Sequence, residues 1–297
     1  MRDPVEVTVR FSNVTGDPDK PDGAGNAHGM AARFHLAGEE HADLIAVSLP
    51  CFTNRLPSDF VEMNYSCFKH MGGRTRKRVL GTLRFALRHR ESLKAMWASF
   101  RMKPIPSYAN GRYNSLNAFT WTTRGRGADD GFGCYVRYSW MPVEGQRSIG
   151  KREAKRRARD FLQQDLDERL GRTPRRPIRF RLEVQLASAD DKDKGRVEDP
   201  TSVWPTKPAR IVPASKDSDR GPPVSKDGMR ARFLTAGVLE LTDLVEGPAI
   251  DGSALGFDPL HLTEGIESSG DRILEFRPQV YELAARERAL ASNDELS

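Results

Sequence analysis

Segments that alternate apolar and polar residues constrain this chain more than any other feature. In residues 5–12, VEVTVRFS, apolar residues occupy every second position and polar residues occupy the others. Successive side chains of a β-strand point to opposite faces, so this period of two predicts a strand with one apolar face and one polar face. Such a strand needs partners on its edges and an apolar layer against its face. The chain must therefore build a sheet around a core.

Similar strand patterns, and helical ones, recur along the chain. We expect further strands at 30–36, 43–52, 117–123, 134–141, 178–188 and 237–245. We expect helices over 58–100 (broken near residues 72–73), over 151–170, and near the C-terminus. This order predicts the α+β class, with a mostly antiparallel sheet that closes as a β-barrel and has flanking helices.

The 297 residues are long enough for one large core, and we expect a single domain over 1–297. The segment 207–232 is rich in lysine, aspartate and proline, which predicts a surface insertion within that domain. Three widely spaced cysteines, Cys51, Cys67 and Cys134, indicate free thiols that are buried or half-buried rather than a zinc or disulfide framework.

The net charge of +6 favours anionic partners in general. The stretch KREAKRRAR (151–159) raises nucleic-acid binding as one hypothesis, but no aromatic platform or reader motif accompanies it. We therefore expect a solvated basic helix face and no specific nucleic-acid partner. The sequence has no apolar run of the ~18 residues that a membrane span requires.

The stretch DRILEFRPQVYELAARER (271–288) clusters two arginines and a tyrosine on one side of the predicted helix. Arg277 lies four residues before Tyr281, and Arg288 lies seven residues after it. A guanidinium beside a phenol stabilises the phenolate and never loses its own charge. The pair therefore suits a tyrosinate that ligates a metal, haem iron being one such metal, although a surface stacking pair is the commoner meaning of this spacing.

Arg10 and Ser12 lie on the polar face of the first predicted strand. If that face meets solvent, the two residues need no explanation. If it lines the inside of a barrel, Arg10 needs a buried anion such as a carboxylate or a propionate.

Taken together, these motifs resemble the haem catalase superfamily, and more closely its small catalase-related peroxidases. VRFS (9–12), the turn NVTG (13–16) and HGMAARF (28–34) occur at the family's spacing, and DLIAVSLPCFTNR (43–55) takes the place of the next strand. CYVRYSW, FRLEVQL, VWP (203–205) and GIESSGDRILEFRPQVY (265–281) follow in the family's order. The resemblance covers nearly the whole chain.

The resemblance implies a role for each matching position. Tyr281 matches the tyrosine that coordinates haem iron, and Arg277 matches the arginine that holds that phenolate ionised. Asp271 matches an aspartate that orients the arginine. Arg10 and Arg288 match arginines that pair with haem propionates. Ser12 matches the serine that hydrogen-bonds the essential distal histidine.

The chain departs from the family pattern at three points. The family's distal histidine precedes VRFS, and none of the eight residues before Val9 is a histidine; we expect an N-terminally truncated reading of a longer gene. Of the other histidines, His28 falls in the predicted loop and His35 on the face opposite Phe34, where we expect ordinary surface or supporting roles. Ser48 is a weak substitute for the distal asparagine. Pro278 predicts a helix that begins or bends there.

The resemblance implies a haem-dependent, catalase-related peroxidase that binds haem b and acts on hydrogen peroxide or organic hydroperoxides, with an unidentified electron donor. A variant within the same fold rearranges fatty-acid hydroperoxides. The alternative is a haem-binding but catalytically impaired remnant that lacks the distal histidine. We also expect a cytoplasmic location, unless a signal precedes the N-terminus, and we leave a homo-oligomer open.

Overall fold

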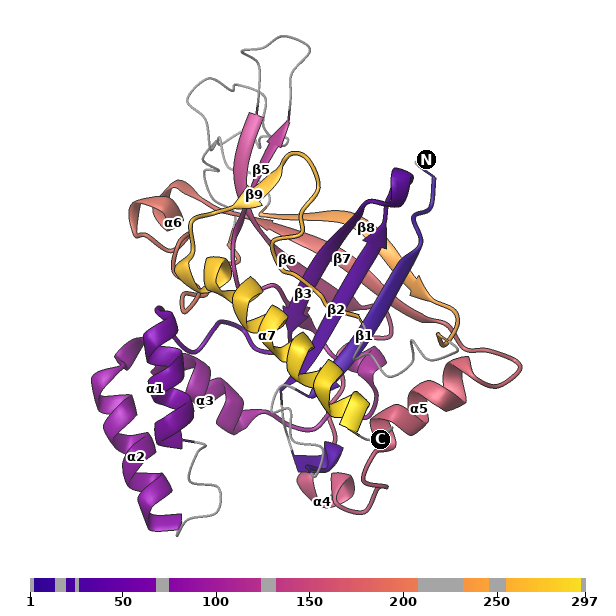
Figure 1. Cartoon of the computed structure of the whole chain (residues 1–297), viewed down its shortest axis with the longest axis horizontal. Coiled ribbons are helices and arrows are strands. Elements are labelled where there is room, and N and C mark those ends of the chain that lie inside the picture. The colour runs from indigo at the N-terminus through magenta and orange to yellow at the C-terminus, as the bar shows by residue number, and fades with distance from the viewer. Residues whose placement is uncertain are drawn as a thin grey trace.

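The structure is a computed structural model that describes residues 3–13, 20–24, 27–67, 75–123, 132–207, 232–245 and 255–294. Its strands form one antiparallel sheet (Figure 1). They are β1 (Val7–Asn13), β2 (His28–His35), β3 (His41–Val47), β4 (Tyr113–Asn114), β5 (Phe119–Thr123), β6 (Phe132–Pro142), β7 (Ile178–Leu186), β8 (Phe233–Leu241) and β9 (Ile266–Ser268). The predicted insertion at 207–232 falls almost wholly outside the described residues.

Helices flank this sheet. They are α1 (Pro57–Cys67), α2 (Thr75–Arg88), α3 (Leu93–Arg101), α4 (Lys151–Ala154), α5 (Phe161–Leu170), α6 (Ala189–Asp193) and α7 (Arg272–Asp294). Short 3-10 helices occupy Asp22–Ala24, Ala37–Glu39, Arg90–Ser92 and Tyr108–Asn110. Within the described ranges, no helix has both the length and the apolar character that crossing a bilayer requires.

The sheet is a path with a branch at β6. The path runs β1–β2–β3–β4–β6–β5–β9, and β7 and β8 branch from β6. A single residue pair, Val47 with Asn114, joins β3 to β4. The α+β class and the antiparallel sheet are therefore confirmed. Closure of the predicted barrel is not detected, because the strand pairs found among the described residues leave β1 and β8 at free ends of the sheet.

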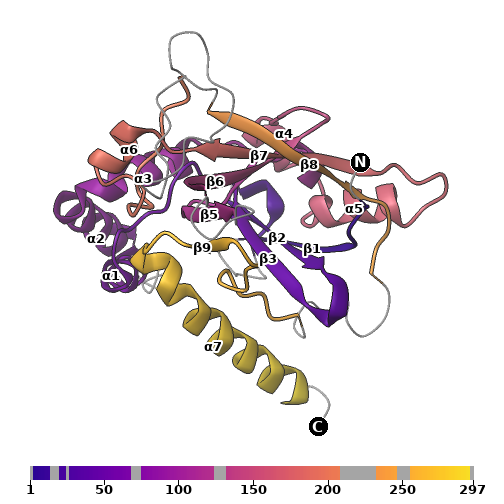
Figure 2. The same cartoon turned by 90° about the horizontal axis from the view of Figure 1, so that it is seen from above.

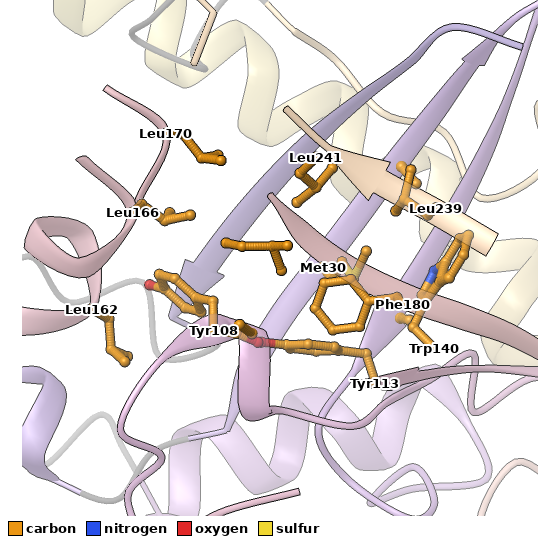
Figure 3. Close-up of a cluster of buried hydrophobic side chains, with 14 of the residues drawn as sticks. Met30, Tyr108, Tyr113, Trp140, Leu162, Leu166, Leu170, Phe180, Leu239 and Leu241 are labelled. Carbon is orange, nitrogen blue, oxygen red and sulfur yellow. The ribbon is translucent and has the colours of Figure 1, made fainter. Parts of the chain in front are cut away.

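The curled sheet nevertheless encloses one main core. Figure 3 shows Met30 from β2, Phe180 from β7 and Leu239 from β8 around the same apolar interior. From β1, Phe11 enters this core and stacks on Tyr108 with ring centroids 4.6 Å apart. The apolar face predicted for the first strand is thus the inner face, and its burial is what holds the two ends of the sheet together.

The polar face of β1 meets the C-terminal helix instead. Residues paired across antiparallel strands share a face, and Arg10 pairs with Ala31, which pairs with Ile45. We call the surface formed by Arg10, Ser12, Gly29, Ala31 and Ile45 the outer face. Figures 1 and 2 show α7 lying across it. Neither option considered from the sequence, open solvent or barrel interior, describes the place of Arg10.

The helix predicted over 151–170 is two helices. The chain leaves helical geometry after Ala154 and resumes at Phe161. A continuous helix would stack like charges one turn apart in KREAKRRAR, which destabilises it. In addition, the carboxylate of Asp22 accepts a 2.9 Å hydrogen bond from the backbone N–H of Leu162, so a distant loop caps the second helix.

The last helix begins at Arg272, because Asp271 accepts hydrogen bonds from the backbone N–H groups of Ile273 and Leu274 and caps it. Of the two alternatives expected at Pro278, a helix start there is therefore wrong, and a bend there stays a prediction. The expectation for His28 was also wrong. His28 is not in a surface loop; it is the first residue of β2 and only 1 % exposed. Its pairing with Asn13 makes the β1–β2 ladder longer than predicted, because the first strand was expected to end at residue 12 and the second to begin at residue 30.

Candidate functional site

The centre of the candidate site is the contact between Arg277 and Tyr281 on α7. Four residues apart on a helix, the two side chains lie one turn from each other, and Arg277 Nη2 donates a 3.0 Å hydrogen bond to the phenolic oxygen of Tyr281. The sequence spacing therefore gives the expected contact, with Pro278 between the two residues and inside the helix. The proline removes one backbone donor of α7 and does not separate the pair.

A buried amide holds the guanidinium from behind. Arg277 Nη1 donates to Asn117 Oδ1 at 2.7 Å, and Asn117 Nδ2 donates to Asp271 Oδ2 at 2.6 Å. Asn117 and Asp271 are both fully buried. The four residues form one chain of hydrogen bonds, Asp271–Asn117–Arg277–Tyr281, in which Asn117 lies between the aspartate and the arginine.

The carboxyl of Asp271 has two functions in this chain. Its Oδ1 caps α7, and its Oδ2 holds Asn117. Burial raises the pKa of this carboxyl, and the hydrogen bonds from Asn117 and from the first turn of the helix act in the opposite direction. Because the same residue fixes the start of α7 and the amide behind Arg277, the helix and the guanidinium are positioned together.

Opposite Tyr281, the outer face presents small apolar side chains. Ala31 and Ile45 form a buried cluster with Phe257, against which Tyr281 packs. At Gly29 a Cβ atom would lie 2.6 Å from Ser12 Oγ, so the glycine leaves room for the serine hydroxyl. Ser12 itself is exposed on this face.

Arg10 is fixed at the edge of the same surface. Its Nη1 donates to the backbone carbonyl of Leu255 at 3.1 Å, and its guanidinium lies over the ring of Phe257, 4.7 Å from the centroid. The guanidinium of Arg33 lies over the same ring, 5.0 Å from the centroid. The phenyl ring therefore contacts one guanidinium from β1 and one from β2. These contacts hold the cationic side chain of Arg10 beside the apolar cluster against which Tyr281 packs.

An ion pair anchors the segment that carries Phe257. Arg33 and the buried Asp43 make two hydrogen bonds of 2.9 and 2.8 Å between neighbouring strands. Arg33 also donates to the carbonyl of Gly256, and Asp43 Oδ2 accepts from the backbone N–H of Asp258. The 255–258 segment is thus attached to β2 and β3 from both sides.

Sequence reasoning missed Asn117, Arg33, Asp43 and Phe257. The partners of Asn117 lie 154 and 160 positions away in the chain, and Gly256 lies 223 positions from Arg33. A pattern over a short window carries no information on such pairs. The one signal in the sequence was the position of Asn117 at the start of the strand predicted over 117–123.

The other predicted residues lie elsewhere or outside what can be described. Arg288 is in the last turns of α7, and its side chain is outside the described part of the chain. His28 and Ser48 do not face Tyr281. Both line a separate cavity of about 510 Å³, where the backbone N–H of His28 donates to Ser48 Oγ at 2.9 Å. Burial lowers the pKa of His28 to about 4.

The donor set at this contact fits haem. A phenol oxygen beside a permanently charged guanidinium suits a ferric ion, small apolar side chains suit the flat macrocycle, and Arg10 suits a carboxylate. In this structure Tyr281 lies directly against the Ala31–Ile45–Phe257 cluster. A macrocycle between them therefore requires α7 and the outer face to separate.

Comparisons with known proteins bear on the family and on the fold. The family model described as Catalase matches residues 2–216. The chain is 29 % identical over 288 residues to a catalase-related peroxidase of Mycolicibacterium paratuberculosis, covering 96 % of this chain and 78 % of that protein. It is 26 % identical over 286 residues to a catalase-related peroxidase of Synechococcus elongatus, covering 96 % of this chain and 73 % of that protein.

Solved structures share the fold. A fungal catalase superposes with a TM-score of 0.74 at 20 % identity, covering 96 % of this chain and 52 % of that one. Catalase A of Saccharomyces cerevisiae gives a TM-score of 0.72 at 20 % identity, covering 96 % and 54 %. The chain thus spans about half the length of these solved catalases.

Proposed function

The chain belongs to the catalase family, and from that membership we propose that it is a haem-dependent peroxidase that acts on hydrogen peroxide or organic hydroperoxides. The observation that carries the proposal is the hydrogen bond from Arg277 to the phenolic oxygen of Tyr281, supported from behind by Asn117 and Asp271. Two of the relatives reported above are named catalase-related peroxidases, which favours this branch. In this proposal the sheet also closes as a β-barrel.

In this proposal, haem b supplies the iron at which the peroxide O–O bond is cleaved. The protein residues hold and orient that group. Tyr281 would ligate the iron through its phenol oxygen, and Arg277 would stabilise negative charge on that oxygen. Asn117 and Asp271 keep the guanidinium from rotating away. Arg10 and Arg288 would pair with the propionates, and Ser12 would orient a distal base where one is present.

Reconstitution with haemin tests the ligand assignment. The wild-type chain should give the spectrum of a high-spin ferric haem with a tyrosinate ligand, and Tyr281→Phe should lose it. Tyr65→Phe, at an exposed tyrosine on α1, is the matched control and should keep it. An unchanged spectrum in Tyr281→Phe would disprove the assignment.

Turnover assays then separate the activities. Oxygen evolution from hydrogen peroxide measures dismutation, and oxidation of an organic donor measures peroxidase activity. Product analysis with a fatty-acid hydroperoxide detects rearrangement. Each assay is compared with Tyr281→Phe, which should lower the rate to the level of free haemin.

A haem-binding protein with impaired turnover is the second candidate, and the position of His28 favours it. His28 lies on the inner side of β2, next to Ser48, and Tyr281 packs against the outer face. In the described β2 and β3 strands, the outer face carries His35 and His41, which pair with each other at the end of the ladder opposite to Gly29. Without a general base, peroxide turnover should fall by ~10²–10⁴-fold. Haem binding with negligible turnover would support this candidate, and brisk oxygen evolution would exclude it.

A further inference from the structure

A histidine and three carboxylates meet where α1 packs beside the end of α2. Asp59 and Glu62 lie on the first turns of α1, His89 directly follows α2, and Glu91 lies in the short 3-10 helix Arg90–Ser92. His89 Nδ1 is 3.3 Å from Glu91 Oε1 and 3.9 Å from Asp59 Oδ2. His89 Nε2 is 3.3 Å from Glu62 Oε2. None of these residues belongs to the site on α7.

The two nitrogens of His89 have different surroundings. Nε2 faces one carboxylate oxygen, to which it can donate its proton. If it does so, a neutral ring carries a lone pair on Nδ1, and that lone pair faces oxygens of both Glu91 and Asp59. Three lone pairs that face one another repel, and a metal ion between them would satisfy all three.

The geometry suits a metal ion. The candidate ligand atoms of Asp59, His89 and Glu91 all lie within 4.8 Å of one another. Ligands bound to a tetrahedral Zn²⁺ at about 2.0–2.1 Å are roughly 3.3 Å apart, so small side-chain rotations bring these atoms to coordinating positions. The ring of His89 is already fixed, because it stacks on the buried Phe85 with centroids 4.4 Å apart.

The hydrogen bonding of the His89 ring resembles that of a metal-bound histidine. Metal-binding imidazoles usually donate their other N–H to a carboxylate, which fixes the tautomer and the ring orientation. Glu62 occupies that position, and its second oxygen accepts from Arg88 at 3.4 Å. With a neutral imidazole, the three carboxylates and this one guanidinium sum to a charge of −2, which a divalent cation neutralises.

We propose that Asp59, His89 and Glu91 bind a divalent transition-metal ion with Glu62 as the positioning residue. One imidazole nitrogen with two carboxylate oxygens favours Zn²⁺ over Mg²⁺ or Ca²⁺, which prefer oxygen ligands alone. Water completes the coordination. The ion joins α1 to the segment that leads into α3, so it stabilises the helical region independently of any haem.

Calorimetric titration of the whole chain with ZnCl₂ tests the site. Wild type should bind one equivalent with high affinity, and MgCl₂ should not compete. Asp59→Asn and His89→Gln should each weaken Zn²⁺ binding by at least about 100-fold, and Glu62→Gln by roughly 10- to 100-fold. His261→Gln is the matched control, because this exposed histidine stacks on His41 and is a second place where zinc can bind incidentally. It should leave the high-affinity site intact.

Hydrogen exchange locates the bound ion and covers a variant that folds poorly. Zn²⁺ should slow amide exchange in peptides from α1 and from residues 89–92 of the wild type, and leave α7 unchanged. Zn²⁺ binding that His89→Gln leaves unaltered, or protection centred on His261, would overturn the proposal. So would the absence of a saturable site in the wild type.

Discussion

Replacing Asn117 by alanine should destabilise the folded protein far more than the loss of an ordinary buried amide. Asn117 is 0 % exposed and joins two charged groups, Asp271 and Arg277, through bonds of 2.6 and 2.7 Å. Each hydrogen bond to a charged partner is worth ~1.5–3 kcal/mol, and a buried carboxylate that loses its partner adds a desolvation cost. We expect the free energy of unfolding to fall by about 4 kcal/mol.

Asn54 provides a control with the same atoms removed. It is also 0 % exposed, and its amide makes one long bond of 3.4 Å to the hydroxyl of Ser92. The cavity left by Asn54→Ala is similar in size, and the lost bond is neutral and weak, so the cost should be about 1 kcal/mol. The difference between the two variants, about 3 kcal/mol, isolates the charged partners.

Urea unfolding followed by far-UV circular dichroism measures both variants without haem. The free energy of unfolding should fall with urea concentration at the same slope in both variants, and the urea concentration at the midpoint of unfolding should be lower for Asn117→Ala. If the two variants lose stability equally, within about 0.5 kcal/mol, the hydrogen-bonded chain is not what holds Arg277 in place. The haemin spectrum of Asn117→Ala then adds a second readout, since a displaced Arg277 should weaken the tyrosinate bands.

Three further predictions follow from the described contacts. Burial lowers the pKa of His28 to about 4 from 6.5 in the unfolded chain; the unfolded chain therefore binds the extra proton first, and the stability contributed above pH 6.5, about 3 kcal/mol at most, is lost as the pH falls toward 4. His28→Gln should flatten that part of the stability–pH curve, and an unaltered curve contradicts the assignment. Asp43→Asn, which leaves Arg33 without its buried carboxylate, should cost about 3 kcal/mol in urea unfolding, whereas the same change in an exposed Arg–Glu pair should cost less than ~1 kcal/mol. Gly29→Ala places a Cβ 2.6 Å from Ser12 Oγ and should cost ~1–3 kcal/mol; the cost should disappear in a Ser12→Ala background, and a cost that persists there rules out this contact as its source.

Most of the fold could be predicted because period-two and helical patterns are local. The first strand, the strand over 178–186 and the C-terminal helix lie where their patterns place them. The contact between Arg277 and Tyr281 was also predictable, since both residues share one helix and the helix fixes their separation. Conversely, the single helix expected over 151–170 failed because a capping residue, Asp22, comes from a distant loop.

The sequence by itself determined which face of each strand is apolar, that the last helix aligns a tyrosine with an arginine, and that the chain resembles the catalases. The tertiary structure alone decided which surface the polar face of β1 meets, and that α7 covers it. It also placed Asn117 between Asp271 and Arg277, and His28 on the side away from Tyr281. The reason is physical: periodicity fixes the direction of a side chain relative to its own backbone, whereas its partner depends on how segments more than a hundred residues apart pack together.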